Sequence, residues 1–142
     1  MTVRFVDTNV LLYSVSKDPS EELKANRAQA ILADRDIRLS VQVLQEFYGQ
    51  STRASRPDPL THEQASGLVE AYLRFQTQEI TKELLLAALS TKVRFAISYW
   101  DAAIIEAARV SGCDTVVSED LSDEQDYDGI RVENPFKDLE HQ

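Results

Sequence analysis

Residues 3–12 read VRFVDTNVLL, and this segment decides the fold class. Its first four residues are mostly apolar, which favours a short buried strand. Apolar side chains then recur at helical spacing between residues 9 and 16, which predicts a helix. A strand that leads directly into a helix is the unit from which parallel sheets are built. Asp7 stands at the junction between the two.

The same alternation continues along the chain. Further strands are predicted at residues 37–39, 75–80, 115–117 and 131–133. Further helices are predicted at residues 20–34, 41–52, 61–73, 81–92 and 102–110. Residues 98–101 begin the last of these helices. Ser20 and Ser40 are the expected N-caps of the first two of these helices. Residues 56–60 contain two prolines and form a stiff connector. The polar, acidic residues 122–128 are expected to form a surface loop.

This order of elements predicts an α/β fold, a three-layer sandwich with a mainly parallel central sheet. With 142 residues, of which 43% are hydrophobic, the chain is expected to form a single domain over residues 1–142. The lone cysteine, Cys113, excludes an internal disulfide and a cysteine-rich zinc site. No stretch approaches the roughly 18 apolar residues of a membrane span. We therefore expect a cytoplasmic protein with no membrane association.

The formal net charge of −9 is unevenly distributed. Residues 114–142 hold 10 acidic and two basic side chains, whereas residues 1–113 are almost balanced, with 14 acidic and 13 basic side chains. Binding of phosphate groups needs positive charge near the site and not a positive total. The charge therefore neither requires nor excludes a nucleic-acid substrate.

Four carboxylates are predicted to meet at one edge of the sheet. Ligands of parallel α/β sheets bind at the carboxyl ends of the strands, where the loops lead into the following helices. The candidates at such positions are Asp7, Glu46, Asp101 and Asp120. Carboxylates this close repel one another unless a cation lies among them, and all-oxygen sites suit Mg²⁺ or Mn²⁺. Such a site supports attack of a metal-activated water on a phosphodiester.

Each of these carboxylates also has an ordinary structural interpretation. Asp7 is placed to cap the following helix, and Asp101 fits a capping arrangement with Ser98. Glu46 on an amphipathic helix is typical of a solvated glutamate, and Asp120 is typical of a turn. Helix capping and metal binding are compatible for the same aspartate.

Five short motifs together resemble the PIN-domain ribonucleases, and within them the VapC-type toxins of bacterial toxin–antitoxin pairs. The motifs are FVDTNVL at residues 5–11, VLQEFY at 43–48, YWDA at 99–102, SEDL at 118–121 and NPF at 134–136. The resemblance extends along the whole chain. The acidic turn at residues 122–125 departs from the family's pattern, and no role follows for Asp123 or Glu119.

The resemblance implies an Mg²⁺-dependent or Mn²⁺-dependent endoribonuclease that acts as the toxin of a toxin–antitoxin pair. It makes Asp7, Glu46, Asp101 and Asp120 the catalytic and metal-binding residues. It implies that Asn9 and Ser118 hold these ligands or their waters, and that Thr8 bonds locally. The implied partners are an RNA substrate, an antitoxin protein and a second copy of the chain.

Two other functions stay open. A phosphohydrolase with an aspartyl-phosphate intermediate would use Asp7, but it needs a second aspartate where this chain has Asn9. A catalytically silent PIN-like module would bind RNA or protein without cleaving it.

Side chains outside the four carboxylates also bear on function. Arg53 and Arg56 are candidates for steering RNA phosphates. Trp100 is expected to lie in the core, as is the helical stripe formed by Leu84, Leu85, Ala88 and Leu89.

Overall fold

The computed structural model describes residues 3–139; residues 1–2 and 140–142 of the expected domain lie outside the described part. The strands are β1 (Arg4–Val6), β2 (Ile37–Ser40), β3 (Gln76–Gln78), β4 (Thr115–Val117), β5 (Asp126–Tyr127) and β6 (Ile130–Glu133). The helices are α1 (Thr8–Ser14), α2 (Glu22–Leu32), α3 (Val41–Ser51), α4 (His62–Tyr72), α5 (Lys82–Phe95) and α6 (Tyr99–Val110), with 3₁₀ turns η1 (Pro19–Glu21) and η2 (Lys137–Leu139). None of these helices is long and apolar enough to cross a membrane.

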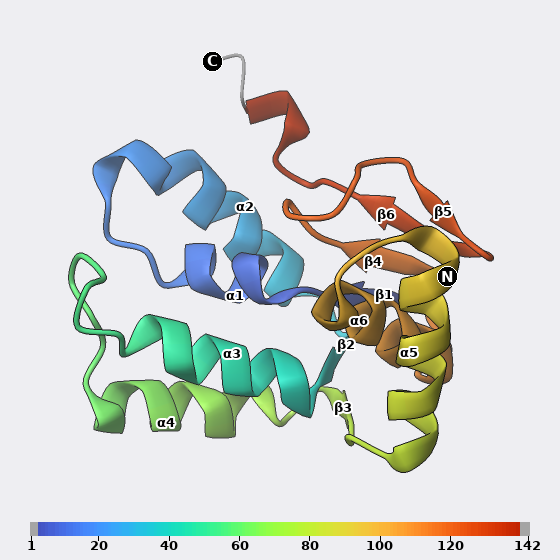
Figure 1. Cartoon of the computed structure of the whole chain (residues 1–142). Helices are drawn as coiled ribbons and strands as arrows, with labels where there is room; N and C mark the ends of the chain where they lie inside the picture. The colour runs from blue at the N-terminus through green and yellow to red at the C-terminus, as the bar shows by residue number, and fades with distance from the viewer. Residues whose placement is uncertain (1–2, 140–142) are drawn as a thin grey trace.

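The six strands form one sheet in the order β3-β2-β1-β4-β6-β5. All neighbouring strands are parallel except the β5–β6 pair. The chain moves outward from β1 to β2 and β3, then returns to the other side of β1 to form β4. Because crossovers between parallel strands are right-handed, this reversal places α1–α4 on one face and α5–α6 on the other (Figure 1). The predicted α/β sandwich with a mainly parallel sheet is confirmed.

The core lies on both sides of the central strands. Phe5 and Val6 of β1 and Val116 and Val117 of β4 are fully buried, because helices cover both faces of these strands. The small side chains along α6 allow this helix to pack closely against the sheet and against α5. The central strands are thereby fixed, and with them the loops that leave their carboxyl ends.

The predicted surface loop at residues 122–128 contains a strand that the periodicity analysis missed. Residues Asp126–Tyr127 form β5, which pairs antiparallel with β6. Asp128 and Gly129 connect the two strands, and both have positive φ angles, of 54° and 93°. An Asp-Gly pair with this backbone is a favoured two-residue hairpin turn, so the sequence did contain the signal. Arg109 of α6 fixes the turn by donating to the carbonyl oxygens of Tyr127 and Asp128, at 2.7 Å each.

One predicted helix cap is wrong and another is confirmed. Asp18, and not Ser20, caps the segment that leads into α2: its carboxylate accepts from the backbone N–H of Ser20 at 2.9 Å, and the segment begins with the 3₁₀ turn η1. The proline after Asp18 favours this start. Ser40 caps α3 as predicted, since its hydroxyl accepts from the N–H of Val43 at 3.2 Å.

One core prediction is wrong, and another is confirmed only in part. Trp100 is 64% exposed, because it lies at the open beginning of α6. In the predicted stripe of α5, Leu84 and Ala88 are buried, but Leu85 and Leu89 are exposed. Within residues 3–139, only one side of α5 packs against the rest of the chain. Its other side presents an apolar stripe to solvent, formed by Leu85, Leu86, Leu89 and Val93.

Candidate functional site

A cavity of about 300 Å³ opens at the carboxyl ends of β1 and β4. These strands are adjacent, and they lie where the direction of sheet growth reverses, which is the preferred ligand position in open α/β sheets. All four predicted carboxylates line it: Asp7, Glu46, Asp101 and Asp120. Asn9 also lines the cavity, and Ser118 is fully buried just behind it. The fold thus gathers residues that are up to 113 positions apart in the sequence.

Asp7 is buried and serves as the N-cap of α1. One of its carboxylate oxygens accepts from the backbone N–H of Thr8 at 2.8 Å. The other accepts from the hydroxyl of Ser118 at 2.7 Å and lies 3.5 Å from the amide nitrogen of Asn9. The structural interpretation of Asp7 as a helix cap is therefore correct, and the same side chain also lines the cavity.

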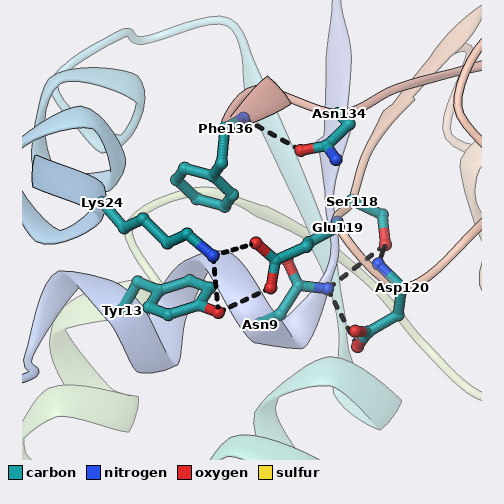
Figure 2. Close-up of polar contacts among 8 residues, drawn as sticks. All are labelled: Asn9, Tyr13, Lys24, Ser118, Glu119, Asp120, Asn134 and Phe136. Atoms are coloured by element: carbon teal, nitrogen blue, oxygen red, sulfur yellow. Dashed lines mark hydrogen bonds and ion pairs between the residues drawn. The ribbon is translucent and has the colours of Figure 1, made fainter. Parts of the chain in front are cut away.

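Asn9 connects the beginning of α1 to the turn after β4 (Figure 2). Its amide group donates to the hydroxyl of Ser118 and to the carboxylate of Asp120, both at 3.2 Å. Its amide oxygen accepts from the backbone N–H of Glu119 at 3.1 Å. These three contacts fix the position of Asp120 relative to Asp7.

Glu46 is held by two side chains. The hydroxyl of Thr8 donates to one of its carboxylate oxygens at 2.7 Å, and the amide of Gln42 donates to the other at 3.0 Å. Thr8 bonds locally as expected, through its backbone N–H to Asp7, but its hydroxyl also reaches Glu46 because α1 packs against α3. Sequence analysis missed Gln42, although it lies one helical turn before Glu46 on the same face of α3.

Asp101 and Asp120 complete the rim of the cavity. Asp101 is half-buried in the first turn of α6, where its backbone N–H donates to the N-cap hydroxyl of Ser98 at 3.0 Å. Asp120 is exposed, and its backbone N–H donates to the hydroxyl of Ser118 at 3.1 Å. Both carboxylates therefore extend from anchored backbone.

Burial and mutual repulsion make the cavity unfavourable for ionised carboxylates. The pKa of Asp7 is raised to about 6, mainly by burial; the hydrogen bonds from Ser118 and Thr8 lower it, and the charges of Glu46 and Asp120 raise it. Burial likewise raises the pKa of Asp101, as do the charges of Asp120 and Glu46. A bound cation would offset this repulsion.

Asp7 is expected to make folding less favourable as the pH rises. Its pKa is higher in the folded protein than the ordinary value of 3.8, so the folded state retains the proton longer than the unfolded state does. The free energy of unfolding should therefore fall between about pH 4 and pH 6 and stay low above that range. Between pH 4.5 and 7.5 the free energy of unfolding of the wild type should fall by about 2 kcal/mol more than that of Asp7→Asn. Urea unfolding of both proteins measures this difference. Parallel pH profiles for the two proteins would contradict the burial of this charge.

The donor atoms of the cavity suit a hard divalent cation. Carboxylate oxygens are the preferred ligands of Mg²⁺ and Mn²⁺. Within residues 3–139, however, no three Asp, Glu, His or Cys side chains converge closely enough to hold one ion. The residues therefore fit a metal in chemistry and in location, and joint coordination by three of them requires side-chain movement.

A second polar cluster borders the cavity and was not predicted. Lys24 of α2 pairs with the carboxylate of Glu119 at 2.5 Å, and the hydroxyl of Tyr13 donates to the same carboxylate at 2.5 Å (Figure 2). The ring of Phe136 packs edge-on against Tyr13, with 5.0 Å between ring centroids. Tyr13 lies one helical turn after Asn9, which is a weak signal, and nothing near Lys24 in the sequence indicates its contact.

Comparison with known proteins agrees with this architecture. A profile of the PIN domain matches residues 4–122. No curated protein matches the chain. The similar solved structures include the VapC20 toxin of Mycobacterium tuberculosis, described as cleaving the sarcin–ricin loop, with 20% identity, a TM-score of 0.63, and coverage of 82% of this chain and 91% of that one.

Two further similar structures are chains of toxin–antitoxin assemblies. One is a toxin–antitoxin complex from Klebsiella pneumoniae, with 16% identity, a TM-score of 0.67, and coverage of 93% of this chain and 97% of that one. The other is DNA-bound VapBC from Salmonella typhimurium, with 19% identity, a TM-score of 0.66, and coverage of 95% and 99%. At these identities the likeness establishes a shared fold.

Proposed function

The chain belongs to the PIN-domain family, and we propose on this basis that it is a divalent-metal-dependent endoribonuclease, the toxin of a type II toxin–antitoxin pair. The observation that carries the proposal is the cavity at the ends of β1 and β4, which four carboxylates from separate parts of the chain line. Capping of α1 explains the position of Asp7, but it does not explain why Glu46, Asp101 and Asp120 line the same cavity.

The proposed catalytic and metal-binding residues are Asp7, Glu46, Asp101 and Asp120. A metal bound by them would activate water for attack on a phosphodiester and neutralise charge on the phosphoryl oxygens. The surrounding side chains position these carboxylates. Asn9 and Ser118 orient Asp7 and Asp120, while Thr8 and Gln42 orient Glu46. Hydrolysis would leave a 5′-phosphate and a 3′-hydroxyl on the RNA.

The proposed protein partners are an antitoxin and a second copy of the chain. The similar chains from K. pneumoniae and S. typhimurium were crystallised with antitoxins, which supports an antitoxin here. An acidic cavity would accept a basic side chain of such a partner. The exposed apolar stripe of α5 (Leu85, Leu86, Leu89 and Val93) supports a homodimer, because soluble monomers rarely leave such a stripe uncovered.

The proposal is tested by cleavage of total RNA with purified protein, in Mg²⁺ or Mn²⁺ and in chelator. An Asp7→Asn variant purified in the same way is the control for contaminating nucleases. We expect cleavage by the wild type that requires the metal and that the variant lacks. Absence of cleavage by antitoxin-free protein would favour the silent binding module, and equal cleavage by both proteins would reveal a contaminant.

A further inference from the structure

The carboxylate cavity contains a single basic side chain among its described lining residues. Arg56 lines it together with six acidic residues, which are the four proposed ligands plus Glu21 and Glu119. A polyanionic substrate is repelled by such a cavity unless cations offset the acidic charge. Among residues 3–139, Arg56 is the one basic side chain that lines the cavity and can attract a phosphate.

Arg56 is available for a ligand. It is half-buried, yet within residues 3–139 its guanidinium makes no salt bridge within 4.0 Å and no hydrogen bond. By contrast, Lys24 beside the same cavity is fully engaged with Glu119 and Tyr13. An arginine that stays unpaired among carboxylates retains its donors for a group that is absent from the free protein.

The backbone holds Arg56 in place. It lies in the proline-rich connector between α3 and α4, and its N–H donates to the carbonyl oxygen of Arg53 at 3.0 Å. The end of the connector is fixed by Leu60, whose N–H donates to the carbonyl oxygen of Ser51 at 2.8 Å. Pro57 and Pro59 restrict the segment between these points. The backbone position of Arg56 is thus set before any ligand binds.

A second cavity, of about 600 Å³, continues from the first. It lies between two connectors, residues 15–21 and residues 56–60, and shares Glu21 and Arg56 with the carboxylate cavity. Lys17 is its other basic residue; it is exposed and, among the described residues, makes no salt bridge. Two of its acidic side chains, Asp18 and Glu21, accept hydrogen bonds from serines. A groove with two unpaired cations therefore leads away from the carboxylates.

We propose that Arg56 and Lys17 form a phosphate-binding subsite that guides an RNA strand from the carboxylate cavity along the groove between residues 15–21 and 56–60. This inference rests on the proposed ribonuclease function and adds the path of the substrate. Arg56 binds the backbone phosphate next to the one cleaved, and Lys17 binds a phosphate further along. Phosphate contacts position the strand and carry no sequence information.

The test measures binding of a single-stranded RNA of mixed sequence to the full chain, in an Asp120→Asn background in which cleavage is expected to be about 10³-fold slower. Arg56→Gln should weaken binding about 5- to 10-fold and lower the slope of log K against log salt by about 0.7, the value for one phosphate contact on a single strand. Lys17→Gln should act in the same direction. Arg56→Lys should recover most of the affinity, because it retains the charge.

Arg35→Gln is the matched control. It removes the same charge, but Arg35 is exposed, lies in the loop before β2 at the edge of the sheet opposite the cavity, and lines neither cavity. In the active protein, Arg56→Gln should raise KM and leave kcat nearly unchanged. If Arg56→Gln matches Arg35→Gln in affinity and salt slope while the wild type still cleaves RNA, the subsite is wrong and the ribonuclease stands. If the wild type does not cleave RNA and the Asp120→Asn protein does not bind it, both are wrong.

Discussion

Asp120→Asn is expected to reduce metal-dependent RNA cleavage by roughly 10³-fold, which corresponds to about 4 kcal/mol of transition-state stabilisation. Asn has the same shape as Asp, and its oxygen can still accept the hydrogen bond that Asn9 donates at 3.2 Å. The substitution therefore removes the charge and leaves the turn after β4 in place. Initial rates at saturating Mg²⁺, with the 5′-phosphate product identified, provide the measurement.

The structure offers a control that separates this effect from a general loss of negative charge. Glu63→Gln makes the same chemical change on the exposed first turn of α4, where Glu63 lines none of the cavities described. Its cleavage rate should match that of the wild type. Mg²⁺ should raise the melting temperatures of the wild type and of Glu63→Gln. It should raise the melting temperature of Asp120→Asn much less. An Asp120→Asn rate within threefold of wild type would remove Asp120 from the proposed site.

Phe136→Ala is expected to lower the free energy of unfolding by about 3 to 5 kcal/mol, which amounts to a drop of roughly 10 °C or more in melting temperature. Phe136 is fully buried although it lies only a few residues from the end of the chain. Its ring packs against Tyr13, and the Nζ atom of Lys24 lies 5.8 Å from the ring centroid. Asn134 fixes the turn, because its side-chain oxygen accepts from the N–H of Phe136 at 2.9 Å.

Phe136→Leu keeps most of the buried volume and should cost less than about 1.5 kcal/mol. Urea unfolding of both variants measures the difference. Phe136→Ala should also loosen Tyr13 and Lys24, and through them the Glu119 side chain beside Asp120. Equal stabilities for the two variants would mean that the Asn134–Phe136 segment contributes no packing. This segment lies beyond the region matched by the PIN-domain profile.

Features that depend on neighbouring residues follow from the sequence. The alternation of apolar strands with amphipathic helices is local, so it predicted the mainly parallel α/β fold and most element positions. Ser40 could be recognised as a cap because its partner lies three residues away. The four carboxylates were identifiable because each follows a strand or opens a helix at the same edge of a parallel sheet, and because their motifs resemble a known family.

Contacts between distant segments were decided only by the tertiary structure. Thr8 binds Glu46, 38 positions away, because α1 packs against α3, and Lys24 reaches Glu119 only because α2 lies over the turn after β4. The docking of α5 against α6 decides which side of α5 is covered and whether Trp100 is exposed. The sequence thus determined the elements through short-range propensities, and it indicated the residues of the candidate site through their positions at strand ends and the resemblance of their motifs to a known family. The contacts of these residues, and the availability of Arg56 for a ligand, depend on packing between segments that are far apart in the sequence. Such packing produces no periodic pattern in the sequence.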